Sequence, residues 1–234
     1  SLTMQPKTAN PDALLKGWGI SALNTKGYKG EGDIATGQDN FSIALLDEGW
    51  EVFCVFDGHG KNGHWPATRG ARALPAFLRD AKAVAFLRNG DAKSALLHAF
   101  ARTEAHIERQ ALKESVDLTC NGSTASVVLR HPDKDIAWIA TLGDSRVVLI
   151  VPGIGVTNES RDHKPTDLVE SKRIRQSGGD IRSETHDGFT ATRVFRPKEN
   201  IPGLGMTRSL GDLSVKEFGV IATPEVVEWP LAGK

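Results

Sequence analysis

The sequence predicts an α+β fold in which amphipathic helices pack against antiparallel sheet. Three observations support this class: two short strand-like runs come first, two long helical patterns follow, and further strand-like runs come after them. The chain has 234 residues, of which 39% are hydrophobic and 25% are charged. That composition is ordinary for a globular protein, and the length allows one large domain or two small ones. The order of the elements therefore predicts helices that cover the faces of a sheet.

Five strand-like runs are bounded by Gly, Pro, Asn or Asp, which are the residues that favour turns. They span residues 41–46, 51–56, 123–130, 135–141 and 145–151. A four-residue connection joins the first two runs, which predicts a hairpin. Short turns also join the last three runs, so we expect these to form a meander.

Two helical patterns lie between the strand groups, over about residues 66–85 and about residues 91–113. Asp91 is the expected N-cap of the second. One face of that helix is apolar, because these residues recur at helical spacing: Leu96, Ala99, Phe100, Ile107 and Ala111. A third helix over 165–176 is expected to end at Gly178, which serves as a glycine C-cap.

Charge and cysteine content argue against several classes of protein. Lys plus Arg number 29 and Asp plus Glu number 29, so no overall basic field recruits nucleic acid or a membrane surface. Two cysteines cannot form a disulfide framework, and Cys54 lies in an apolar run that favours a free buried thiol. No apolar run is long enough to span a bilayer. We therefore expect a monomer in a reducing compartment, which makes it intracellular, cytoplasmic or nuclear. Residues 1–16 are expected to be a flexible lead-in to one domain over 17–234.

The tetrapeptide Asp57-Gly58-His59-Gly60 directly follows the apolar run 52–56. A carboxylate can ligate a hard cation, an imidazole can move a proton near neutral pH, and glycine lets the backbone approach a ligand closely. The same four residues could also form an ordinary turn. The glycine spacing excludes a P-loop, and the Gly-x-Ser-x-Gly motif of serine hydrolases is absent from the sequence.

Further short motifs occur in a fixed order around this tetrapeptide. They are Gln38-Asp39-Asn40, Gly122-Ser123-Thr124-Ala125, Gly143-Asp144-Ser145-Arg146, Asp162-His163-Lys164-Pro165, Ser177-Gly178-Gly179 and Thr207-Arg208-Ser209-Leu210-Gly211-Asp212. Over roughly residues 17–229 the series resembles that of the PP2C (PPM) family of metal-dependent Ser/Thr protein phosphatases. The resemblance implies a sandwich of two antiparallel β-sheets, flanked by antiparallel α-helices, with a metal site in a cleft at one end.

The resemblance also implies an activity, which is hydrolysis of phosphoserine and phosphothreonine in phosphoprotein substrates by a water that bridges two divalent cations. Asp57 matches the aspartate that bridges both metals, and the Gly58 carbonyl matches a ligand to one of them. Asp39 matches an aspartate near the waters of the first metal, and Asp144 matches a position that can hold a third, weakly bound metal. Oxygen ligands favour Mg²⁺ or Mn²⁺ over zinc. His59 matches the general acid that protonates the departing oxygen.

Other polar residues are expected to have structural roles. Solvated or packing roles are expected for three histidines: His64, His98 and His106. His163 is expected to be a structural hydrogen-bonding residue, and Asp144 also suits a tight turn between strands. Arg208 and Asp212 are expected to form a pair that holds a loop under the cleft.

Two departures from the family pattern leave a second function open. Family members commonly carry an Arg shortly before the position of Gln38 that binds the substrate phosphate. Residues 30–37 contain no Lys or Arg, so Lys26 or Lys29 would have to reach the site. The pattern also continues past the position of Lys234 into two further metal-binding aspartates, so we expect a domain that is incomplete at its C-terminus. The alternative is therefore a pseudophosphatase, a PP2C-like regulatory or binding module without turnover.

Overall fold

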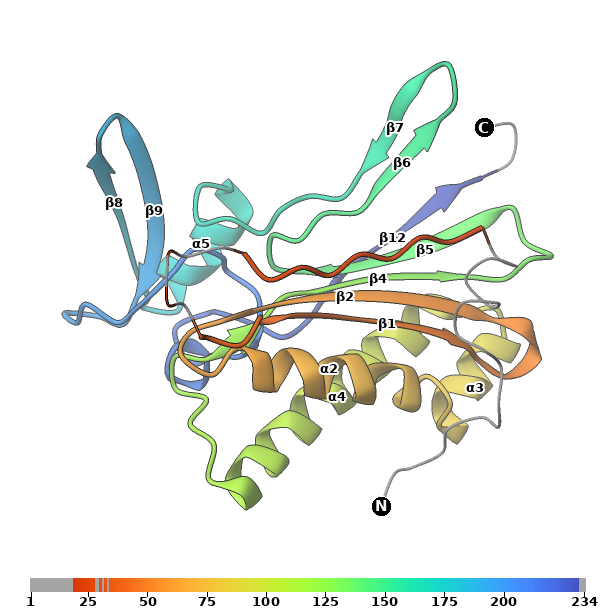
Figure 1. Cartoon of the computed structure of the whole chain (residues 1–234), viewed down its shortest axis with the longest axis horizontal. Coiled ribbons are helices and arrows are strands. Elements are labelled where there is room, and N and C mark those ends of the chain that lie inside the picture. Colours follow the sequence, from red (N-terminus) through yellow and green to blue (C-terminus); the bar gives the residue numbers. More distant parts are fainter. Residues whose placement is uncertain (1–18, 28–29, 31, 33, 232–234) are drawn as a thin grey trace.

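A seven-stranded antiparallel sheet forms the centre of the structure, a computed structural model that describes residues 19–27, 30, 32 and 34–231 (Figure 1). Its strands follow the order β11-β3-β2-β4-β5-β12, and β1 pairs with the other edge of β2. The bounds are β1 Asp39–Leu45, β2 Glu51–His59, β3 Gly122–Ser123, β4 Ala125–Arg130, β5 Ile136–Leu142, β11 Leu210–Gly211 and β12 Glu225–Pro230. The expected lead-in over 1–16 lies outside the described residues.

The predicted hairpin between the first two strands is confirmed. A single 3-10 turn, η1 (Asp47–Gly49), joins β1 to β2. The register places Asp39 directly opposite Asp57. In an antiparallel pair, side chains that lie opposite each other project from the same face of the sheet. The hairpin therefore brings the two aspartates to one end of the sheet, on one face.

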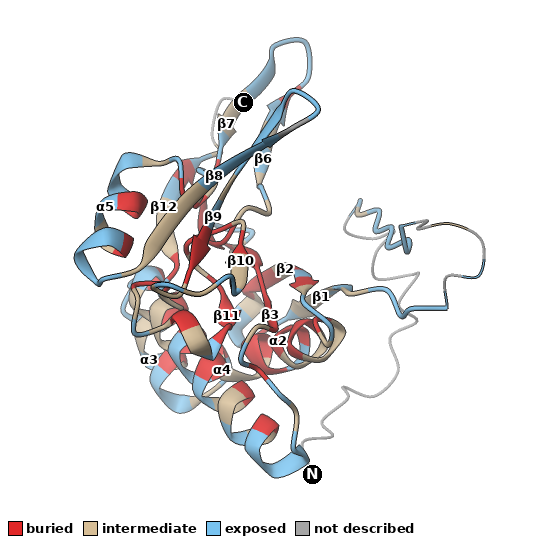
Figure 2. Ribbon diagram, turned by 90° about the vertical axis from the view of Figure 1, so that its left-hand side faces the viewer, coloured by how far each residue is buried: buried red, intermediate tan, exposed pale blue. Residues whose placement is uncertain are grey.

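The helices α2 (His64–Phe77), α3 (Ala81–Arg88) and α4 (Ala92–Glu114) form a layer on one face of the sheet. Fully buried side chains fill the space between the layers, and they include Val52, Phe56, Leu74, Leu96 and Phe100. Figure 2 shows buried residues where the helices meet the sheet. The apolar stripe predicted for residues 91–113 is buried along α4. The predicted N-cap is confirmed, because the Asp91 carboxylate accepts a hydrogen bond from the backbone N–H of Ser94 at 2.9 Å.

The prediction of one helix over residues 66–85 is wrong, because the chain forms two helices there. Asp80 lies between them in an extended conformation, and its carboxylate accepts hydrogen bonds from the backbone N–H groups of Lys82 (3.1 Å) and Ala83 (2.9 Å). An Asp that satisfies the first free N–H groups of a helix starts a new helix at that position. The new helix changes the chain's direction and lets α3 pack beside α4.

The predicted meander over the last three strand-like runs is correct only for β4 and β5. The free edge of β5 is taken by β12, with Glu225 opposite Thr141. Strand β6 (Val148–Val151) therefore leaves the sheet and forms a separate hairpin with β7 (Gly155–Glu159). A strand that begins more than seventy residues further along the chain thus decides where β6 goes.

A third sheet lies beside the central one and contains β8 (Asp180–His186), β9 (Phe189–Phe195) and β10 (Pro202–Leu204). It packs against α5 (Leu168–Gln176), and a short 3-10 helix, η2 (Leu213–Val215), follows β11. Gly178 has φ +80° just after α5, in agreement with the predicted glycine C-cap. The third predicted helix thus starts at residue 168 instead of 165.

The face of the central sheet opposite the helix layer carries much less of the described chain. The segment 20–25 lies across it (Figure 1). Together with the sheet, this segment lines a cleft of about 940 Å³. The floor of this cleft is apolar and includes Phe41, Ile43, Phe53 and Val128. The α+β class is confirmed. Within the described residues, α5 is the one α-helix outside the layer of α2, α3 and α4, and β6 and β7 form a hairpin of two strands.

Candidate active site

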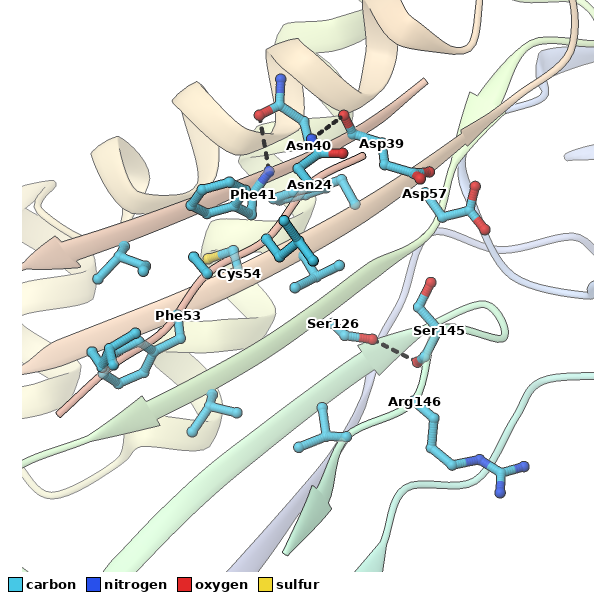
Figure 3. Close-up of a pocket in the computed structure, with 18 of the residues that line it drawn as sticks. Asn24, Asp39, Asn40, Phe41, Phe53, Cys54, Asp57, Ser126, Ser145 and Arg146 are labelled. Carbon is cyan, nitrogen blue, oxygen red and sulfur yellow. Dashed lines mark hydrogen bonds between the residues drawn. The ribbon is translucent and has the colours of Figure 1, made fainter. Parts of the chain in front are cut away.

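Two neighbouring carboxylates stand at one end of the cleft, where β1 begins and β2 nears its end. Figure 3 shows Asp39 and Asp57 side by side there, with Ser145 and Arg146 across the cleft. Desolvation by the surrounding protein raises the pKa of Asp57, and the negative charges of Asp39 and Asp144 raise it further. Such repulsion between carboxylates is relieved when a cation binds between them. The oxygen-only donor set suits a hard cation such as Mg²⁺ or Mn²⁺.

Gly58 follows Asp57 at a point where the backbone is too crowded for any other residue. A Cβ built on Gly58 would lie 2.1 Å from the carbonyl oxygen of Gly63 and 2.7 Å from that of Gln38. The backbone N–H of Gly58 donates to the Gln38 carbonyl at 3.2 Å, and the Gln38 side-chain amide donates to the Gly60 carbonyl at 2.7 Å. The glycine thus lets the loop close tightly beside the carboxylate pair, which fixes the position of Asp57.

His59, the last residue of β2, is held by a carboxylate that comes from far along the chain. Its Nε2 lies 2.6 Å from Oδ2 of Asp212, whose side chain is fully buried. Burial by itself would lower the pKa of His59, but the hydrogen bond and the charge of Asp212 outweigh it, so the pKa is raised. The other ring nitrogen, Nδ1, is buried and has no hydrogen-bond partner in the described part of the chain. The imidazole is therefore fixed in orientation through one nitrogen only.

The expected pair of Arg208 and Asp212 does not form, because each residue binds a different partner. Arg208 binds both carboxylate oxygens of Glu170, at 2.6 and 3.0 Å, while Asp212 binds His59. Arg208 precedes β11 and Asp212 follows it, so the strand separates the two residues. Arg208 thus stabilises α5, and Asp212 belongs to the site.

Glu170 of α5 is a buried residue that the sequence analysis did not identify. Its carboxylate also accepts hydrogen bonds from Arg173 at 2.7 Å and from the Thr207 hydroxyl at 2.6 Å. Desolvation alone would raise the pKa of Glu170, but these bonds and those from Arg208 hold it well below its usual range. The spacing of Glu170 and Arg173 is the one local signal of an ion pair, and it does not reveal that the pair is buried.

Asp144 lies in the tight loop after β5 and forms an ion pair with Lys164, whose Nζ donates to Oδ2 of Asp144. The fully buried His163 joins the two loops that carry this pair. Its backbone N–H donates to the Gly143 carbonyl at 2.9 Å, and its Nδ1 accepts from the Gly143 N–H at 3.1 Å. Since Nδ1 accepts, the ring proton is on Nε2, which faces Glu225 at 3.4 Å. Burial lowers the pKa of His163, so the ring is neutral and has the structural role that was predicted.

The remaining predicted positions are also placed by the structure. His98 binds Asp80 at 2.8 Å and His106 packs edge-on against Phe77, in agreement with packing roles. Lys29, one of the two lysines considered for substrate phosphate, lies outside the described residues. No group of three or more His, Cys, Asp or Glu side chains in residues 34–231 is arranged to enclose a metal ion. Asp39 and Asp57 therefore fit part of a metal site, with Asp144 nearby.

These features define an α+β protein with an acidic site at one end of an antiparallel sheet. The sequence profile of the family "Protein phosphatase 2C" matches residues 29–234. "Probable protein phosphatase 2C 64" of Oryza sativa subsp. japonica is 35% identical and covers 78% of this chain and 43% of its own length. "Protein phosphatase 1K, mitochondrial" of Xenopus laevis is 34% identical over 80% of this chain and 46% of its own length. The chain belongs to the protein phosphatase 2C family.

Solved structures show the same fold. A serine-threonine phosphatase 2C from Toxoplasma gondii superposes with a TM-score of 0.67 at 18% identity, covering 85% of this chain and 70% of that one. A sex determining protein of C. elegans gives 0.66 at 23% identity, covering 91% of this chain and 50% of that one. The chain spans about half the length of the curated relatives that it matches.

Proposed function

We propose that this chain belongs to a metal-dependent protein serine/threonine phosphatase, which hydrolyses phosphoserine and phosphothreonine esters in phosphoproteins. The observation that carries the proposal is the carboxylate pair Asp39 and Asp57, with His59 two residues beyond Asp57. The family is generally metal dependent, and relatives are named as protein phosphatases. The acidic site would repel a phosphate dianion unless cations balanced its charge, which also favours a metal-loaded state.

Asp39, Asp57 and the Gly58 carbonyl would hold the cations, with Asp144 as the weaker position. Bound Mg²⁺ or Mn²⁺ would supply Lewis acidity and a water of lowered pKa for attack on phosphorus. The chain's own contribution is to fix the two carboxylates on one face of the β1–β2 hairpin. The tight backbone around Gly58 limits their movement, so the donors are held ready before any cation binds.

His59 is proposed as the general acid that gives a proton to the departing Ser or Thr oxygen. Asp212 holds Nε2, and Nδ1 is buried without a partner in the described residues, so the ring would have to turn toward the cleft to bring Nδ1 to the leaving oxygen. The hydrogen bond and the charge of Asp212 raise the pKa of His59, which favours the protonated imidazole that can act as a donor. An alkoxide is a poor leaving group, so a proton delivered as the ester bond breaks lowers the barrier.

The second candidate is a pseudophosphatase that binds partners without turnover. One observation favours it: within the described residues, three ligating side chains do not meet at one point. A binding module has no need, however, for a carboxylate pair beside a histidine that a buried aspartate orients. The enzyme is therefore the function that the site supports best.

The experiment that separates these functions is release of phosphate from a phosphothreonine peptide by the full chain, in millimolar Mn²⁺ and in EDTA. Turnover in Mn²⁺ that stops in EDTA supports the enzyme. Peptide binding without phosphate release in either buffer supports the pseudophosphatase. A phosphotyrosine peptide serves as the substrate control.

Partners and location are proposals as well. We expect phosphoprotein substrates, a monomer, and a cytoplasmic or nuclear location. Within the described part of the chain, no helix is long and apolar enough to cross a membrane.

A further inference from the structure

One ion pair in the site joins Lys164 to Asp144, the carboxylate proposed as the weaker cation position. Lys164 donates to Asp144, and the charge of Asp144 acts on both Asp57 and His59. Asp144 directly precedes Ser145, which lines the cleft and bonds Thr124, the residue that accepts from the backbone N–H of Asp57. The ammonium group therefore lies near the acidic end of the cleft. Its side chain is 42% exposed, whereas that of Asp144 is 19% exposed. The ammonium group of Lys164 is thus open to solvent on the same loop pair that carries Asp144.

The pair is built into the fold because the backbone on both sides of it is fixed. His163, directly before Lys164, makes two hydrogen bonds to Gly143, directly before Asp144. The carbonyl of His163 in turn accepts from the backbone N–H and the hydroxyl of Thr207, at 2.8 and 3.1 Å. An exposed ion pair is ordinarily worth little, because two long side chains must be ordered to make it. Here the backbone supplies much of that order.

Two arginines of the described residues in this region are already committed to carboxylates. Arg146 binds both oxygens of Asp162 at 3.0 Å and also Glu159 at 3.0 Å. Arg208 is held by both oxygens of Glu170. By contrast, Lys164 uses one of its three N–H donors on Asp144, so two donors remain for a second ligand. Of these three cations, Lys164 is therefore the one best able to change partner.

We propose that Lys164 is the residue that binds the substrate phosphate. Lys164 would stay paired with Asp144 until a divalent cation binds to that carboxylate and releases the ammonium group. In the exchange, Asp144 would pair with the cation in place of the ammonium, and the released ammonium would pair with a phosphate oxygen. Until a cation binds, the ammonium offsets the charge of Asp144, which alone would repel the phosphate. This proposal rests on the proposed function, since it assigns a residue to the same site.

The first arm of the test needs no metal. Asp144→Asn removes the carboxylate that holds Lys164, and the double variant Asp144→Asn/Lys164→Met removes the released cation as well. Binding of inorganic phosphate in EDTA is followed by ³¹P NMR. We expect Asp144→Asn to bind phosphate about tenfold more tightly than the wild type, because an ion-paired hydrogen bond is worth roughly that much. The double variant should lose this gain, which separates the effect of Lys164 from the lost negative charge.

The second arm measures Mg²⁺ and phosphate binding by calorimetry for the wild type, Lys164→Met and Lys164→Arg. Lys164→Met should bind Mg²⁺ about two- to fivefold more tightly, because its competitor is gone. The same variant should bind phosphate about tenfold more weakly at saturating Mg²⁺. Lys164→Arg should recover most of the phosphate binding, because it keeps the charge. Lys93→Met, in the first turn of α4, removes the same charge from the helix layer and should match the wild type.

The outcomes separate the two proposals. If the double variant keeps the phosphate affinity of Asp144→Asn, the role of Lys164 is overturned whatever the metal does. If Lys164→Met binds phosphate as the wild type does at saturating Mg²⁺, it is overturned as well. If the wild type binds no Mg²⁺ at millimolar concentration, the metal-dependent function fails, and the metal-free arm still decides whether Lys164 binds phosphate.

Discussion

Removal of the buried Glu170 carboxylate should destabilise the fold more than most single substitutions. Glu170 is fully buried and accepts bonds from Arg173, Thr207 and Arg208. Glu170→Gln keeps the size of the side chain but leaves two guanidinium groups without their counter-charge. Breaking a buried ion pair by removing one partner costs about 3–5 kcal/mol. For a domain of this size that corresponds to a fall in Tm of roughly 6–20 °C.

The assay is urea unfolding followed by circular dichroism, with Glu217→Gln as the control. Glu217 is exposed, so its substitution should change the free energy of unfolding by about 0.5 kcal/mol or less. A Glu170→Gln variant that unfolds at the wild-type urea concentration would refute the reasoning, because it would show that the carboxylate does not balance the two arginines.

The contribution of the Glu170 carboxylate to the free energy of unfolding should depend on pH in one direction. The folded pKa of Glu170 lies below its unfolded value, so its stabilising contribution is complete above the unfolded pKa near 4.5. It is lost as the pH falls from there through the folded pKa, by about 1.4 kcal/mol per pH unit. The difference between wild type and Glu170→Gln should therefore be largest near pH 7 and shrink below pH 4.

Three further predictions concern single contacts. Asp212→Asn suits the left-handed backbone at that position (φ +50°) but weakens the hydrogen bond that holds His59. The kcat for a phosphothreonine peptide should therefore fall roughly tenfold or more, whereas the kcat for p-nitrophenyl phosphate should fall much less, because that leaving group needs no acid. Equal losses for both substrates would contradict the role of His59. Gly58→Ala should lower the free energy of unfolding by about 3 kcal/mol, measured by thermal unfolding. Gly27→Ala should not, because a Cβ at Gly27 meets no atom within 4 Å. Equal Tm values for the two variants would contradict the crowding at Gly58. Asp80→Ala should lower the free energy of unfolding by about 1–2 kcal/mol, because α3 loses its N-cap. Chemical denaturation measures this change, and an unchanged free energy would mean that α3 does not need the Asp80 cap.

Local sequence signals predicted the elements whose formation depends on nearby residues. The hairpin of β1 and β2 has a short turn and two apolar runs, and α4 has an Asp cap and an apolar stripe. The break at Asp80 was missed because neither Gly nor Pro marks it, and a mid-helix Asp looks the same as a capping Asp in sequence. Strand β6 was misplaced because its pairing depends on β12, which competes for the edge of β5.

In the candidate site as well, some residues could be predicted from local sequence and others could not. Asp39 and Asp57 were predictable because the hairpin register brings them together. The partners of the site residues were not, because they come from distant loops. Asp212 lies 153 positions after His59, and its pairing follows from the passage of β11 beside β3. The binding of Asp144 by Lys164 depends on a buried histidine whose contacts no local pattern reveals.

The central claim is that the carboxylate pair of β1 and β2 supports metal-dependent phosphate hydrolysis. Its most direct test is the rate of phosphate release from a phosphothreonine peptide in millimolar Mn²⁺ by wild type and Asp57→Asn, with circular dichroism to confirm that both are folded. The account predicts turnover by the wild type and its abolition in Asp57→Asn without a fall in Tm. Near-normal turnover by Asp57→Asn would contradict it.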